Sequence, residues 1–118
     1  MDAIFGQNRE YIHRVSEYTK INVMHGISLV ETFDSWYVYI VRCSDDSLYT
    51  GITMDVGRRV QEHNNDDQQG AKYTRTRRPV YLVYQELFNS RSTATKRECE
   101  IKRLNRMEKE LLIKQYQT

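Results

Sequence analysis

The stretch from residue 36 to residue 53 reads WYVYIVRCSDDSLYTGIT, and it decides the fold. Its first eight residues are dense in β-branched and aromatic side chains, which favour a strand. The next four, Ser-Asp-Asp-Ser, are turn formers. Residues 48–53 favour a second short strand, so the whole stretch is predicted to fold as a β-hairpin.

The elements after the hairpin follow from hydrophobic spacing and from capping residues. A helix is expected over 55–63, with Thr53 or Asp55 as its cap. The further elements expected are a polar loop at 64–70, a basic segment ending at Pro79, a strand over 80–87, a helix from Ser90 or Ser92 to about Leu104, and a last helix over 107–116. This order predicts an α+β domain with a three-stranded sheet flanked by helices.

A chain of 118 residues suits one compact domain, which we place at residues 36–118. Residues 1–35 have a different charge balance, with three basic and five acidic side chains against fifteen basic and eleven acidic in the remainder. A helix over 8–24 is expected in this N-terminal extension, because its apolar residues recur at roughly helical spacing.

The composition excludes several classes of protein. Two cysteines, far apart in the sequence and outside any CxxC motif, make neither a disulfide framework nor a zinc site. No apolar run is long enough to span a membrane, and the N-terminus lacks the pattern of a signal peptide. We therefore expect a soluble, cytoplasmic protein with no membrane partner.

The helix expected over 55–63 carries polar groups on its packing side. Val56, Arg59, Val60 and His63 form one stripe, of which two members are apolar. Arg59 and His63 should therefore point toward the domain, where a buried arginine needs an anionic partner. That partner is either a ligand or an internal carboxylate, and the sequence leaves both open.

Glu98 presents the same problem on the helix that begins near residue 90. It shares a stripe with Ala94 and Ile101, on the side that should pack. A carboxylate there needs a cation, which is either a metal ion or a side chain. The simpler alternative is an ion pair with Lys102, one helical turn away.

The segment before Pro79 concentrates positive charge. Lys72, Arg75, Arg77 and Arg78 fall within seven residues with no acid among them. Such a patch can attract phosphates and is typical of nucleic-acid binders. The alternative is a solvated basic loop.

Two tyrosine motifs connect these candidates. Tyr37-Val38-Tyr39 is followed, after nine residues, by Tyr49-Thr50-Gly51. Arg59, His63 and Glu98 then occur in that order downstream. The arrangement resembles the GIY-YIG nuclease superfamily, and in particular its small single-domain bacterial subfamily of the URI type.

The resemblance extends from residue 36 to about residue 113, with one departure. Many relatives carry an asparagine beyond the glutamate, whereas position 110 is Glu110 here. The role of that asparagine is not carried over.

The resemblance implies a metal-dependent DNA endonuclease that hydrolyses phosphodiester bonds in DNA repair or processing. Glu98 would hold one divalent ion, Mg²⁺ or Mn²⁺, both of which suit carboxylate and phosphate oxygens. Arg59 would neutralise charge on the phosphate. Water would be the nucleophile, and Tyr39, Tyr49 and His63 stay open as the group that helps to deprotonate it.

The implied nucleic-acid contacts lie in the basic segment and on the Glu98 helix. They comprise Lys72, Tyr73, Arg75, Arg77, Arg78 and Lys102. Tyr73 could stack on a base, as aromatic residues do in single-strand binders. Single-stranded or structured DNA is the expected substrate, with RNA as an alternative.

Two other functions compete with this one. A catalytically inactive nucleic-acid-binding module would keep the basic segment and discard the metal. A protein-interaction domain would use the N-terminal helix as its contact. Neither alternative needs Tyr39, Tyr49, Arg59 and Glu98 together.

Overall fold

The structure is a computed structural model that describes residues 34–117. Its elements are β1 (Trp36–Arg42), β2 (Leu48–Thr53), α2 (Val56–Asn65), α3 (Lys72–Arg75), β3 (Tyr81–Phe88), α4 (Arg91–Arg103) and α5 (Arg106–Gln117). The expected α+β class, with a three-stranded sheet flanked by helices, is confirmed. The helix expected over 8–24 lies outside the described residues.

The sheet has the order β2-β1-β3, and both neighbouring pairs are antiparallel. Its central strand, β1, is buried from Val38 to Val41, which is why this run is almost entirely apolar and aromatic. β1 and β2 form the predicted hairpin, whose turn contains Asp46 at a φ of 70°. Aspartate tolerates this left-handed conformation better than most residues.

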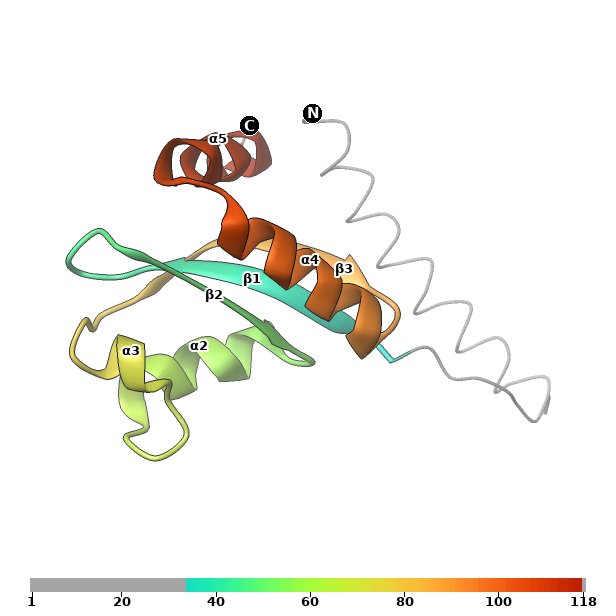
Figure 1. Cartoon of the computed structure of the whole chain (residues 1–118). Helices are drawn as coiled ribbons and strands as arrows, with labels where there is room; N and C mark the ends of the chain where they lie inside the picture. Colours follow the sequence, from blue (N-terminus) through green and yellow to red (C-terminus); the bar gives the residue numbers. More distant parts are fainter. Residues whose placement is uncertain (1–33, 118) are drawn as a thin grey trace, which may run out of the picture.

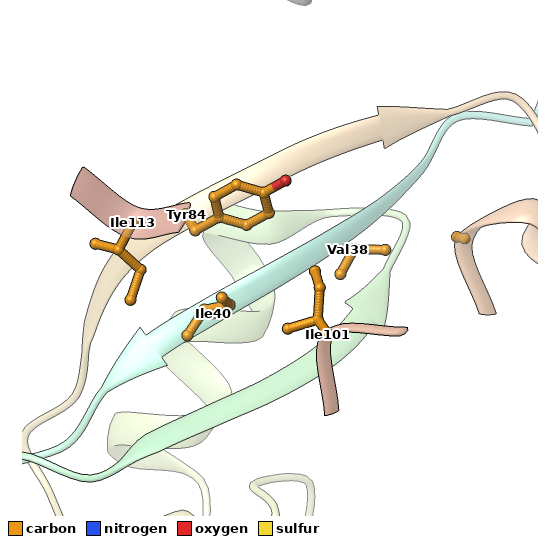
Figure 2. Close-up of a cluster of buried hydrophobic side chains, with 6 residues drawn as sticks. Val38, Ile40, Tyr84, Ile101 and Ile113 are labelled. Atoms are coloured by element: carbon orange, nitrogen blue, oxygen red, sulfur yellow. The ribbon is translucent and has the colours of Figure 1, made fainter. Parts of the chain in front are cut away.

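Alternation along β1 gives each face of the sheet its own core. Val38 and Ile40 pack with Tyr84, Ile101 and Ile113 on the side of α4 and α5 (Figure 2). On the other face, a second cluster combines Tyr39, Val41, Cys43 and Val80. Figure 1 shows α2 and α3 on one side of the sheet and α4 and α5 on the other. The site residues of α2 and α4 therefore approach the sheet from opposite sides.

Side-chain caps set the beginnings of the helices. The Asp55 carboxylate accepts from the backbone N–H of Arg58 at 3.0 Å, and Ser90 Oγ accepts from that of Thr93 at 3.1 Å. Each of these caps was one of two expected candidates. In the described part of the chain, no helix is both long and apolar enough to cross a membrane.

The structure corrects the expected element order at one place. The basic segment contains a short helix, α3, for which no secondary structure was predicted. Four residues are too few to show helical periodicity in a sequence. This turn of helix buries Thr74 and leaves its neighbours exposed.

An ion-pair cluster joins the hairpin to α5. Arg42 donates two hydrogen bonds to Glu110, at 2.9 and 2.7 Å, and a third to Asp46 at 3.1 Å. Arg106 contacts the same two carboxylates. Glu110 is therefore a structural ion-pair partner in this fold.

Replacing Glu110 with glutamine is expected to destabilise the fold at pH 7 but not at pH 2. Its hydrogen bond from Arg42 leads the causes that lower the Glu110 pKa from 4.5 to about 2. A pKa that is lower in the folded state stabilises the folded protein at pH values above the unfolded-state pKa. This stabilisation is lost as the pH falls toward 2. Because the ion pair is partly exposed, we expect the substitution to lower the free energy of unfolding at pH 7 by about 1 kcal/mol at most. Urea unfolding of both proteins at the two pH values measures it, and an equal difference at both would contradict the prediction.

Candidate active site

Tyr39 lies across the edge strand β2. It pairs with Gly51 in the β1–β2 register, and a Cβ atom on Gly51 would lie 2.6 Å from the Tyr39 hydroxyl. A residue with a side chain at position 51 would therefore collide with the phenol. The second tyrosine motif needs its glycine because the first motif places a tyrosine over it.

The Tyr39 phenol meets His63, which belongs to α2. Its Nε2 lies 2.7 Å from the Tyr39 hydroxyl oxygen, and its Nδ1 lies 3.0 Å from Thr74 Oγ1. The imidazole is 0% exposed. Burial is the main cause that lowers the His63 pKa to about 4, and the positive charge of Arg59 adds to it. The ring is therefore neutral at pH 7.

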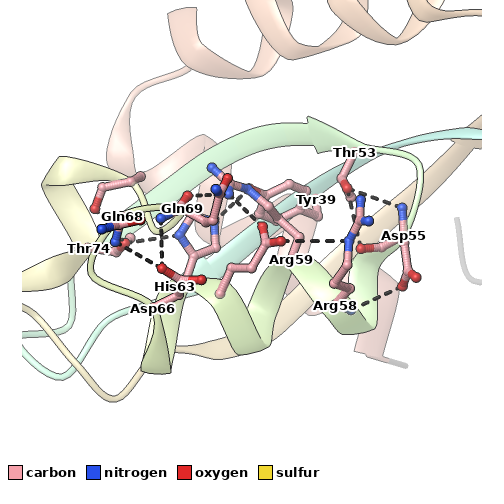
Figure 3. A network of polar contacts seen from close by, with 12 residues as sticks. Tyr39, Thr53, Asp55, Arg58, Arg59, His63, Asp66, Gln68, Gln69 and Thr74 are labelled. Atoms are coloured by element: carbon pink, nitrogen blue, oxygen red, sulfur yellow. Dashed lines mark hydrogen bonds and ion pairs between the residues drawn. The ribbon is translucent and has the colours of Figure 1, made fainter.

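Arg59 and Glu98 both act electrostatically on Tyr39. Burial raises the Tyr39 pKa to about 12, the Arg59 guanidinium opposes this rise, and the negative charge of Glu98 adds to it. Charged groups on α2 and α4 thus both act on the one phenol of β1. The predicted inward orientation of Arg59 and His63 is confirmed (Figure 3).

Arg59 has an internal anionic partner. Its Nη1 donates to Glu62 Oε1 at 2.8 Å and to the backbone oxygen of Gln69 at 2.6 Å. The Glu62 side chain is only 23% exposed and lies against Arg59. The internal ion pair that the sequence left open does form, and it holds the guanidinium beside Tyr39.

Glu98 also has its simpler partner. Lys102 Nζ lies 3.2 Å from its carboxylate, and the Glu98 side chain is 18% exposed. The contact with Lys102 therefore does not distinguish an ion pair from a metal ligand. The negative charge of Glu98 also adds to the raised pKa of Tyr39, so the two residues are electrostatically coupled.

Tyr49 extends the site as part of a row of rings. Its ring meets His63 edge-on, with centroids 5.2 Å apart, and stacks on Tyr73 at 6.0 Å. The Arg77 guanidinium lies 3.9 Å above the Tyr73 ring. Arg77 and Tyr49 thus already contact the ring that was expected to stack on a base.

The basic segment is less uniform than its sequence suggests. The fold brings Asp45 within 3.0 Å of Arg77 and Asp67 within 2.9 Å of Arg78. Arg78 also donates to the backbone oxygen of His63 at 2.7 Å, so it braces the end of α2.

Lys72 and Arg75 differ from these two arginines. Both are exposed, and neither forms an ion pair within residues 34–117. They are the two members of the segment whose charge stays available to a ligand.

A shallow pocket of about 220 Å³ adjoins Tyr49 at the β2 edge. Its lining residues are Leu48, Tyr49, Thr50, Tyr73, Lys102 and Lys109. Lys109 was missed in the sequence, because nothing in the pattern of α5 indicates that it faces β2. Two ammonium groups and two phenols around one pocket suit a phosphate and a base.

The described residues suit a metal ion that takes most of its ligands from a bound substrate rather than from the protein. Residues 34–117 contain no cluster of three or more His, Cys, Asp or Glu side chains that could hold an ion. Glu98 would be the carboxylate ligand, with phosphate oxygens and water completing the set. Mg²⁺ is often bound in this way, through one or two carboxylates and the substrate's phosphates.

The model of the GIY-YIG catalytic domain matches residues 35–111. The chain belongs to the GIY-YIG family. A UPF0213 protein of Staphylococcus aureus is 58% identical over 82 residues, covering 70% of this chain and 98% of the relative. The family resemblance inferred from the tyrosine motifs is confirmed.

Two solution NMR structures are also similar to this GIY-YIG chain. A UPF0213 protein from Bacillus halodurans is 46% identical, covers 68% of this chain and 83% of its own, and has a TM-score of 0.45. A protein from E. faecalis is 40% identical, covers 70% and 88%, and has a TM-score of 0.47. The GIY-YIG domain indicates a nuclease, and nucleases of this family act on DNA.

Proposed function

We propose that this protein is a divalent-metal-dependent DNA endonuclease that cuts single-stranded or structured DNA. The observation that carries the proposal is the hydrogen bond between Tyr39 and His63, in a site that also receives the charges of Arg59 and Glu98. A buried phenol joined to a neutral imidazole suits proton transfer, which a module that only binds nucleic acid does not need. We place its role in DNA repair or processing.

Tyr39 and His63 form a route for a proton. With a pKa near 12, Tyr39 is a phenol at neutral pH and cannot accept a proton unless it also gives one away. His63 is neutral at this pH and can take that proton. Tyr39 would therefore accept the proton of the attacking water while it passes its own to the imidazole.

The charge of Arg59 would link this proton transfer to the binding of DNA. This charge opposes protonation of His63, second only to burial. A DNA phosphate at Arg59 would offset that charge, so His63 becomes more basic when substrate is bound. The same guanidinium would stabilise the negative charge that grows on the phosphate during attack.

Glu98 would hold one Mg²⁺ or Mn²⁺ ion, which supplies charge stabilisation to the phosphate and the leaving oxygen. Glu98 is suited to this role because its side chain is only 18% exposed and its charge acts on Tyr39. Lys102, its partner in the absence of substrate, could turn to a neighbouring phosphate.

The pocket beside Tyr49 favours an unpaired nucleotide. Bases of a duplex are stacked and paired, whereas those of single strands or junctions can enter a pocket and contact aromatic rings. Tyr73 would contact the base with the edge of its ring, since Arg77 and Tyr49 already contact that ring. Lys102 and Lys109 would contact the adjoining backbone.

A cleavage assay tests this function. Single-stranded, duplex and branched DNA, with RNA as a comparison, are incubated with the protein and Mg²⁺, Mn²⁺ or EDTA. We expect cleavage of single-stranded or branched DNA with either metal and none with EDTA. Binding without cleavage under every metal condition would show an inactive nucleic-acid-binding module instead.

The exposed cations of α3 should supply affinity rather than chemistry. Replacing Lys72 and Arg75 together with alanine is expected to flatten the salt dependence of DNA binding, because two fewer cations displace counterions. Cleavage at saturating DNA should persist. Fluorescence anisotropy at several salt concentrations measures the slope, and an unchanged slope and affinity would show that these cations are only solvated.

A further inference from the structure

Thr74 is a buried polar residue that the proposed chemistry has not yet used. It lies in α3, is 0% exposed, and places its hydroxyl oxygen 3.0 Å from His63 Nδ1. It is also the only residue of this four-residue helix that is buried. The short helix therefore holds one hydroxyl against the imidazole.

The hydrogen-bond partners of Thr74 assign its proton. Its hydroxyl donates to the backbone oxygen of Ala71 at 3.0 Å. Threonine hydroxyls in helices commonly form such bonds to a carbonyl three or four residues earlier. A hydroxyl has one proton, so toward His63 the oxygen of Thr74 can only accept. Nδ1 must then carry the single proton of the neutral ring.

The hydrogen bond on the other side of the imidazole, to Tyr39, requires the same tautomer of His63. The Tyr39 hydroxyl is buried, with the residue only 1% exposed, so its proton needs an acceptor. Arg59, which neighbours the phenol, can only donate hydrogen bonds. Nε2 of His63 lies at 2.7 Å and provides the acceptor, provided that it is unprotonated.

We propose that Thr74 is a positioning residue that holds His63 in the Nδ1-protonated tautomer, so that Nε2 is free to accept the proton of Tyr39. The chain of donors runs from Tyr39 to His63 Nε2, and from His63 Nδ1 through Thr74 to the Ala71 carbonyl. The inference rests on the proposed function, because the relay uses Nε2 as its acceptor. In the other tautomer, Nε2 would present a proton to Tyr39 and the relay would be blocked.

The tautomer can be measured directly by ¹⁵N NMR. The chain has three histidines, His13, His25 and His63. Replacing the first two with glutamine leaves His63 as the only labelled imidazole. Without DNA or metal at pH 7, we expect one protonated and one unprotonated ring nitrogen, with the proton on Nδ1. A proton on Nε2 would overturn the inference.

Substitution of Thr74 tests the causal step. Thr74→Val keeps the shape but removes the acceptor, so the Nε2-protonated form should appear in the spectrum and kcat should fall about tenfold. KM for single-stranded DNA should be unchanged. Thr74→Ser keeps the hydroxyl and should restore both the tautomer and kcat. A valine variant with the parent's spectrum and kcat would refute the role of Thr74.

Thr53→Val is the matched control. Thr53 is 6% exposed, and its hydroxyl contacts the backbone of Asp55 rather than His63. Its loss should lower stability while leaving the tautomer and kcat unchanged. The spectrum of the protein with Thr74 intact and His63 as its one histidine tests the inference even if Thr74→Val does not fold. Absence of all DNA cleavage would defeat the proposed function, whereas the spectrum would still test the hydrogen bonds.

Discussion

Replacing Glu98 with glutamine is expected to lower the rate of DNA cleavage by about 100-fold or more. Glutamine keeps the shape of the side chain but removes the charge that would hold the metal. The stabilisation lost is several kcal/mol, and about 1.4 kcal/mol corresponds to a factor of ten. DNA binding should survive, since a negative charge leaves a phosphate site. Single-turnover cleavage and fluorescence anisotropy measure the two effects.

Glu100→Gln is the control for this variant. Glu100 lies two residues further along the same helix and pairs with Arg97 on the exposed surface. Its loss should change neither cleavage nor affinity. If Glu98 serves only as the partner of Lys102, its substitution should cost a few tenths of a kcal/mol of stability and little activity. Full activity of Glu98→Gln would exclude Glu98 as the metal ligand.

Tyr39→Phe is expected to lower kcat by about 100-fold or more, a size typical of losing a positioned proton-transfer group. The ring that lies over Gly51 stays, so the sheet should keep its packing. Only the hydroxyl that faces His63 Nε2 is lost. Affinity for DNA should be close to that of the parent, and kcat and KM on single-stranded DNA separate the two effects.

Tyr84→Phe removes a comparable hydroxyl from the opposite face of the sheet. Tyr84 is also buried, and its hydroxyl donates to Glu86. This variant should lose stability but not kcat. If both tyrosine variants lost stability and kept kcat, Tyr39 would be a packing residue and the proton route would have to avoid it.

Local patterns in the sequence determined the elements and several of their ends. The dense apolar run of β1, the turn after it, and the caps Asp55 and Ser90 act over a few residues, so they can be identified without a fold. The helical stripes also placed Arg59 and His63 on the packing side of α2, and Glu98 on that of α4. Periodicity reports which face is buried, and that information is local.

Tertiary structure alone decided the contacts between residues that lie far apart in the chain. Asp45 and Asp67 reach the basic segment across 32 and 11 residues of chain, so two of its four cations are paired. Lys109 reaches the pocket only because α5 folds back beside the sheet. Thr74 gives no signal in the sequence, because a lone threonine among basic residues resembles any loop position. Its role depends on an imidazole eleven residues away, and such a hydrogen bond exists only once the fold has brought both groups together.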